Sequence, residues 1–160
     1  MPKYDLVIEP GKHEIFMTMT YNAPRELVFR AYTDPALIPQ WWGPRYLTTE
    51  IDKLDARPGG EWRFVQRDPD GNEYAFHGVF HDVSAPERII QTFEWEGMPG
   101  HVQMETAVFE DLGGGRTRVV SQSVFQSVED RDGMAASGME EGISDGNDRM
   151  EELLAQLQTA

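Results

Sequence analysis

The sequence contains no cysteine among its 160 residues. Disulfide bonds, thiolate metal sites and cysteine nucleophiles are therefore excluded together. Basic residues are also few: 14 lysines and arginines stand against 28 aspartates and glutamates, for a formal net charge of −14. Because binding to phosphate groups needs clustered lysine and arginine, this charge argues against nucleic acid and anionic membranes as partners.

Long hydrophobic runs are absent as well. No stretch approaches the roughly 20 apolar residues that a membrane-spanning helix needs, and residues 1–10 hold no apolar stretch of signal-peptide length. We therefore expect a cytoplasmic protein with no membrane partner. Hydrophobic residues at 39% and charged residues at 26% are ordinary for a folded protein. With no internal repeat and no linker, one domain over residues 1–160 is predicted.

Residues 14–44 predict a strand followed by two short helices. Apolar and β-branched residues predict a strand over residues 14–21, and Asn22-Ala23-Pro24 ends it. Apolar residues at helical spacing predict a short helix after Pro24, which is suited to a first helical position. A second short helix is expected over residues 36–40, ending near Gly43-Pro44.

Turns rich in glycine and proline then separate six further segments, and connections this short predict an antiparallel meander. With the first strand this makes about seven strands. The six segments cover residues 46–54, 61–67, 73–83, 88–96, 102–110 and 116–125.

Residues 127–158 lose the strand alternation and predict a long helix. Its apolar stripe contains Met139, Ile143, Met150, Leu153 and Leu157. Gly138, Gly142 and Gly146 follow the edge of that stripe, and each glycine costs a helix interior roughly 1 kcal/mol relative to alanine. Close approach to the sheet, room for a bound molecule, or a bent and frayed helix would each explain them.

Two adjacent tryptophans, Trp41 and Trp42, end the short helices. Each buries on the order of 150–250 Å², and two neighbours cannot both point into one core from a regular element. We expect one ring to close the core and the other to border a second apolar compartment.

Several blocks of sequence resemble a known family in the order in which they occur. They are Ala23-Pro24-Arg25-Glu26-Leu27-Val28-Phe29-Arg30-Ala31, Thr33-Asp34-Pro35, Trp41-Trp42-Gly43-Pro44, Arg57-Pro58-Gly59-Gly60 with Trp62-Arg63-Phe64, Pro86-Glu87-Arg88-Ile89, Gly138-Met139-Glu140-Glu141-Gly142 and Asp148-Arg149-Met150-Glu151-Glu152-Leu153-Leu154. The sequence is similar to the SRPBCC, or START-like, superfamily, and within it to the family of the C-terminal domain of the activator of heat-shock protein 90 ATPase.

The resemblance implies an α+β helix-grip fold, in which a curved antiparallel sheet encloses an apolar cavity against the long C-terminal helix. Members of the superfamily bind lipids, hormones and polyketides, or catalyse reactions on them. Ile143 stands where the family leads us to expect tryptophan, which implies an enlarged or reshaped cavity. Chaperone-activating members normally carry an additional N-terminal domain that this sequence lacks, so a chaperone partner is an alternative only.

Ten residues are the predicted ligand contacts, because aromatic and methionine side chains with a few polar groups are typical of apolar ligand sites. They are Trp41, Trp42, Tyr46, Trp62, Phe64, His77, Trp95, Met139, Ile143 and Met150.

A metal site or a catalytic motif is not predicted. His77 and His81 lie four residues apart in a strand, about 13 Å, which one metal ion cannot bridge. Gly113-Gly114-Gly115 precedes a strand and predicts a hairpin turn, not a phosphate loop. Arg63, Glu94 and Glu105 would matter if they faced the cavity, but charged side chains in strands are expected at the surface.

The leading hypothesis is a non-enzymatic protein, without cofactor, that binds a small hydrophobic or amphipathic molecule. The second is a cyclase, dehydratase or isomerase acting on such a molecule, with His77 or Glu94 as the candidate ionisable residue. The third is a protein-interaction module whose partner is a chaperone or a second copy of the chain, for which an exposed apolar patch is expected.

Overall fold

The computed structural model describes residues 4–159. Eight strands form one sheet in which all neighbours are antiparallel, in the order β1-β2-β8-β7-β6-β5-β4-β3. Their bounds are β1 Tyr4–Val7, β2 Glu14–Tyr21, β3 Thr48–Leu54, β4 Glu61–Arg67, β5 Glu73–Ser84, β6 Arg88–Trp95, β7 Val102–Gly113 and β8 Arg116–Val124.

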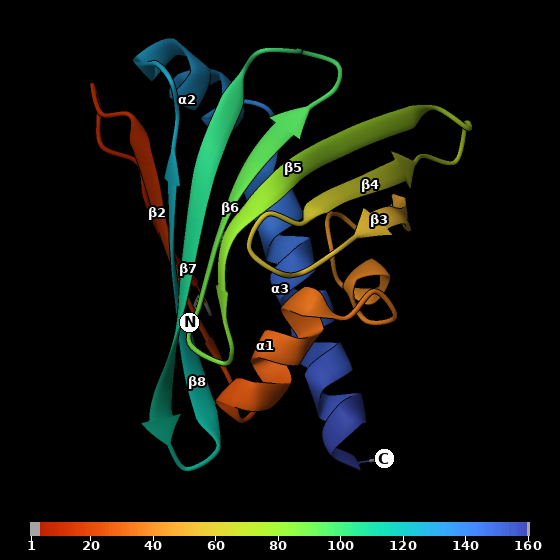
Figure 1. The fold of residues 1–160 in the computed structure, drawn as a ribbon, viewed down its shortest axis with the longest axis vertical. Coiled ribbons are helices and arrows are strands. Elements are labelled where there is room, and N and C mark those ends of the chain that lie inside the picture. Colours follow the sequence, from red (N-terminus) through yellow and green to blue (C-terminus); the bar gives the residue numbers. More distant parts are fainter. Residues whose placement is uncertain (1–3, 160) are drawn as a thin grey trace.

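The helices lie against one face of this sheet. They are α1 Arg25–Thr33, the 3₁₀ turn η1 Ile38–Gln40, α2 Val128–Ala135 and α3 Met139–Thr159. Figure 1 shows the strands curving around α3, with α1 beside it at one end and α2 at the other. This is the predicted helix-grip arrangement. No helix within residues 4–159 is both long enough and apolar enough to cross a membrane.

Three details of the prediction are corrected. The sheet has eight strands instead of about seven, because Tyr4–Val7 pairs with β2, with Tyr4 opposite Met19. Its four residues alternate between half-buried and exposed positions, but so short a run is a weak signal, and pairing along the edge of β2 forms the strand. The helix expected over residues 36–40 is a single 3₁₀ turn containing Pro39, which has no N–H for a longer helical ladder.

The third correction concerns residues 127–158, which form two helices. Ser127 caps the first, since its hydroxyl accepts a hydrogen bond from the Asp130 backbone N–H at 3.0 Å. Gly138, with a φ of +85°, lies between α2 and α3 and reverses the chain. Gly138 is therefore outside the helix whose interior it was expected to weaken.

The core lies between the concave face of the sheet and the helices α1 and α3. α1 contributes Val28 and Phe29, and α3 contributes Met150, Leu153 and Leu154, all buried. From the sheet the buried members include Met19, Tyr21, Trp62, Phe64, Phe80, Ile89, Phe109 and Val119. Several of the sheet residues in this core also line a cavity between the sheet and α3.

Candidate functional site

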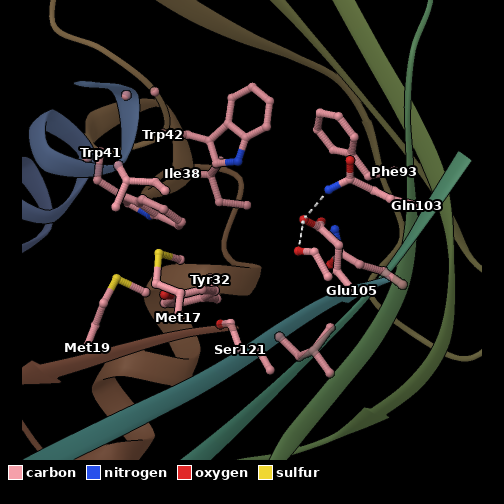
Figure 2. A pocket seen from close by; sticks show the side chains of 18 of the residues that line it. Met17, Met19, Tyr32, Ile38, Trp41, Trp42, Phe93, Gln103, Glu105 and Ser121 are labelled. Carbon is pink, nitrogen blue, oxygen red and sulfur yellow. Dashed lines mark hydrogen bonds between the residues drawn. The ribbon is translucent and has the colours of Figure 1, made fainter. Parts of the chain in front are cut away.

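A cavity of about 350 Å³ lies between the concave face of the sheet, α1, the segment 38–43 and the N-terminal half of α3. Apolar side chains from strands β2 to β8 form most of its walls. Figure 2 shows the two sides of this space, with Trp41, Trp42 and Ile38 opposite Gln103 and Glu105.

The tryptophan pair forms one wall with both of its rings. Trp41 Nε1 donates to the carbonyl oxygen of Ala31 at 2.9 Å, and its ring lies 4.9 Å from that of Tyr32 on α1. Trp42 turns toward the sheet, with edge-to-face contacts to Phe64 at 5.1 Å and Phe76 at 5.4 Å. Both rings are half-buried and both border the cavity. Where one ring was expected to close the core and the other to border the compartment, both pack against the core and both border the cavity, Trp41 on α1 and Trp42 on the sheet.

Close packing of α3 holds this wall in place. A Cβ on Gly146 would lie 3.3 Å from the carbonyl oxygen of Trp41, so a glycine lets the helix approach the backbone there. Arg149 donates from Nη1 to the Gly43 carbonyl at 3.0 Å and from Nη2 to the Pro39 carbonyl at 3.0 Å. Partial burial lowers the pKa of Arg149 from its usual value. Gly146 thus lets α3 approach the backbone of residues 41–43 closely, whereas close approach to the sheet was expected.

A glycine in the sheet makes room for a third tryptophan. Trp62, 1% exposed, crosses over β5 and donates from Nε1 to the Thr92 carbonyl on β6 at 3.2 Å. Gly78 is its cross-strand partner. A Cβ on Gly78 would clash with that carbonyl and lie 2.6 Å from Trp62 Nε1. The bare backbone of Gly78 therefore lets Trp62 lie flat on the cavity floor.

One carboxyl group faces the cavity. Glu105 of β7 accepts hydrogen bonds at Oε2 from Gln103 Nε2 at 3.1 Å and from Ser123 Oγ at 3.5 Å (Figure 2). Burial raises the pKa of Glu105 to about 6, and the two hydrogen bonds partly oppose that rise. Among the described residues, no hydrogen bond reaches its other oxygen, Oε1, which opens onto the cavity.

A second polar group on the wall lacks a partner. Asn147 of α3 is 4% exposed, and its Oδ1 has no hydrogen bond among residues 4–159. A buried carbonyl oxygen without a donor costs roughly 1–3 kcal/mol. Glu105 and Asn147 each keep an oxygen that the described residues leave unpaired, but that of Asn147 is itself buried.

A second compartment of about 500 Å³ adjoins the first, and Phe93, Gln103 and Met134 belong to the walls of both. It lies between the β5–β6 end of the sheet and α2. Three of its apolar lining residues are exposed: Tyr46 at 59%, Met98 at 47% and Trp95 at 38%. These three exposed residues bring the lining of the second compartment to the protein surface.

The predicted contact residues divide into three groups. Six of them line the first compartment: Trp41, Trp42, Trp62, Phe64, Met139 and Ile143. Tyr46 and Trp95 line the second. Met150 and His77 line neither. Met150 is fully buried in the core, three residues beyond Asn147, the last residue of α3 that lines the cavity.

His77 lies on the outer face of the sheet. Its Nδ1 is 2.9 Å from Glu96 and its Nε2 3.3 Å from Glu94. Arg63 joins the group with a bidentate contact to Glu96 at 2.8 and 3.0 Å, which holds the pKa of Glu96 near 2. Successive side chains of a strand point to opposite faces, and Phe76 and Phe93 take the inner positions. His77, Glu94 and Arg63 therefore cannot reach the cavity.

The carboxyl that does reach it is Glu105, for which a surface position was expected. Gln103 and Asn147 had no place among the sequence candidates. Strand alternation was the signal that could have identified Gln103 and Glu105. They share their strand face with Ala107 and Phe109, and Phe109 is 1% exposed. No group of three or more histidine, aspartate or glutamate side chains in residues 4–159 is arranged to hold a metal ion.

Comparisons with known proteins bear on the family and the fold. The model of the family described as activator of Hsp90 ATPase homolog 1-like protein matches residues 22–155. A search of curated proteins found no match.

Solved structures show the same fold. NE0264 from Nitrosomonas europaea is 26% identical, with 96% of this chain and 100% of that chain covered and a TM-score of 0.83. A protein from Staphylococcus epidermidis is 28% identical, with 94% of each chain covered and a TM-score of 0.80. Ms6760 from Mycobacterium smegmatis is 23% identical, with 94% of this chain and 95% of that chain covered and a TM-score of 0.84.

Proposed function

The chain belongs to the family of activator of Hsp90 ATPase homolog 1-like proteins, and from this premise we propose that it binds a small hydrophobic or amphipathic molecule in the cavity between sheet and α3. No cofactor is required for this role. The exposed lining of the second compartment at Tyr46, Trp95 and Met98 is the proposed entrance.

The observation that carries the proposal is an open, aromatic cavity with incompletely paired polar groups on its wall. A core serving stability alone is expected to close to crystal-like density and to pair its buried polar atoms. Here a space of about 350 Å³ stays open beside Glu105 and Asn147. Volumes of about 300–1,000 Å³ with few polar groups are typical of small-molecule sites.

Binding is tested with N-phenyl-1-naphthylamine, a neutral dye whose emission rises in apolar surroundings. We expect saturable binding by the wild type, quenching of Trp41 and Trp42 emission, and a higher melting temperature. The variant Ala107→Phe fills the cavity from β7, and it should raise the dissociation constant by about tenfold or more.

The matched control is Val108→Phe, because Val108 is the next residue on the same strand and is 38% exposed on the outer face. This variant adds the same ring without entering the cavity, so its dissociation constant should stay within about twofold of wild type. Equal loss in both variants, or no saturable binding by the wild type, would contradict the proposal. Native mass spectrometry of the purified protein would then identify any retained small molecule.

Glu105 supports one second candidate, an enzyme acting on the bound molecule. A general acid or base works best with a pKa near the operating pH, and burial brings Glu105 to about 6. Gln103 and Ser123 hold the carboxyl in one orientation. If a retained molecule is converted by the wild type and left unchanged by Glu105→Gln at equal occupancy, this second function replaces simple binding.

A further inference from the structure

We propose that the ligand is an amphipathic cation, an apolar body carrying a protonated amine or comparable group, and that Glu105 binds its charged end. This inference rests on the proposed function and assigns a chemical class to the ligand of the same cavity.

The first argument is the kind of hydrogen bond that the wall leaves open. Glu105 lines the cavity, and only its Oε2 receives hydrogen bonds from the described residues. Its Oε1 is an acceptor left open. A ligand that satisfies this oxygen has to bring N–H or O–H donors, and an ammonium group brings three.

The second argument is the charge of the wall. Among the described residues that line the first compartment, Glu105 is accompanied by no lysine, arginine or histidine. The adjoining compartment adds Glu129 and Asp130 against one histidine, His101, whose Nδ1 lies 2.9 Å from Asp130. A fatty acid or other lipophilic anion would find no cation to pair with in the first compartment, and Glu105 would repel it.

The third argument is the aromatic wall across from the carboxyl. Trp41, Trp42 and Tyr32 lie on the side of the space opposite Glu105 (Figure 2). The face of an aromatic ring attracts a cation, most strongly in the case of tryptophan. A cationic end held at Glu105 would therefore have aromatic rings and, among the described residues, no positive charge across the space from it.

The ionisation states around Glu105 fit this role at neutral pH. Its pKa of about 6 leaves the carboxyl largely ionised there. The other ionisable groups on the wall are Tyr21 of β2 and Tyr32 of α1. Burial raises the pKa of both, that of Tyr32 to about 12, so they remain neutral. β6, β8 and α3 add no ionisable group to this compartment.

The test compares octylamine, 1-octanol and octanoic acid by calorimetric titration at pH 7.5. These probes share one chain and differ in the polar end. The wild type should bind octylamine at least about tenfold more tightly than 1-octanol, and octanoic acid most weakly. Glu105→Gln keeps the shape of the side chain and removes its charge, so it should abolish the preference for the amine while changing the octanol constant by less than about threefold.

The outcomes separate this inference from the function beneath it. Equal affinities for the three probes, or a preference for octanoic acid, would overturn the cationic ligand and leave an apolar binding cavity intact. Failure of all three probes to bind would overturn both. An amine preference that survives in Glu105→Gln would overturn the role of Glu105.

A pH series on the wild type gives a second measurement that needs no variant. Octylamine stays protonated throughout, whereas Glu105 gains a proton as the pH falls through about 6. The affinity of the protein for octylamine should therefore drop by about tenfold between pH 7.5 and pH 5, while its affinity for 1-octanol should not change. A flat profile for octylamine would overturn the proposal.

Discussion

Glu105 is expected to destabilise the folded protein at neutral pH, and replacing it with glutamine should make the protein more stable. The carboxyl has an ordinary pKa of 4.5 and a folded-state pKa of about 6. The folded state therefore holds its proton more tightly than the unfolded state does. Stability is greatest when the group is protonated in both states, and it declines as the pH rises from about 4.5 through 6.

The magnitude follows from the two pKa values. Each factor of ten in the protonation equilibrium corresponds to about 1.4 kcal/mol, so the full penalty above pH 7 is about 2 kcal/mol. Glu105→Gln carries no charge at any pH and escapes this penalty. Its gain in the free energy of unfolding should be about 2 kcal/mol at pH 8 and fall below about 1 kcal/mol at pH 5.

Urea unfolding of wild type and variant, followed by tryptophan emission at four pH values from 8 to 5, measures this difference. That range stays above the isoelectric point of about 4.5. The control is Glu87→Gln, a change at an exposed turn residue, which should alter stability by less than about 0.5 kcal/mol at every pH. A gain in Glu105→Gln that is independent of pH, or a loss of stability at pH 8, would refute the reasoning. A confirmed gain would identify Glu105 as a residue whose cost to stability needs a functional explanation.

Three further changes test the frame around the cavity. Gly78→Ala should destabilise the protein by about 1–3 kcal/mol or more, because the new methyl group clashes with the Thr92 carbonyl and displaces Trp62. The control is Gly133→Ala in α2, where no atom lies within 4 Å of the new methyl group, and this change should stabilise the protein by about 0.5–1 kcal/mol. Arg149→Met leaves the carbonyls of Pro39 and Gly43 without their donor and should lower the free energy of unfolding by about 2 kcal/mol. The control is Arg45→Met, which breaks an exposed ion pair with Glu152 and should lower the free energy of unfolding by less than about 1 kcal/mol. Ile143→Trp projects a larger side chain into the first compartment and should weaken dye binding by about tenfold, which titration of the folded variant will show.

Much of the fold could be predicted from local sequence alone. The ranges expected for β2 and β4 coincide with those observed, Glu14–Tyr21 and Glu61–Arg67. Their signals are local: strand residues alternate along the chain, and glycine and proline mark the turns. β1 escaped prediction because its four residues form a strand only through pairing with β2.

The candidate site was predictable in part. Trp41, Trp42, Trp62 and Phe64 were identified as cavity residues from their size and their match to the family blocks, and all four line the first compartment. His77 was not excluded, although alternation with the apolar Phe76 and Phe80 of the same strand already favours the opposite face for it. The opposite error was made for Glu105, whose charge suggested the surface.

The sequence by itself determined most of the strands and helices and their order, because alternation along a strand and the residues of a turn are signals within a few residues. Which face of the sheet became concave, and where α3 stopped filling it, was decided only by tertiary structure. That decision depends on contacts between distant segments, such as Gly146 against Trp41 and Gly78 beneath Trp62. It turned the tryptophan pair into a cavity wall, put His77 outside, and enclosed Glu105 opposite the two rings.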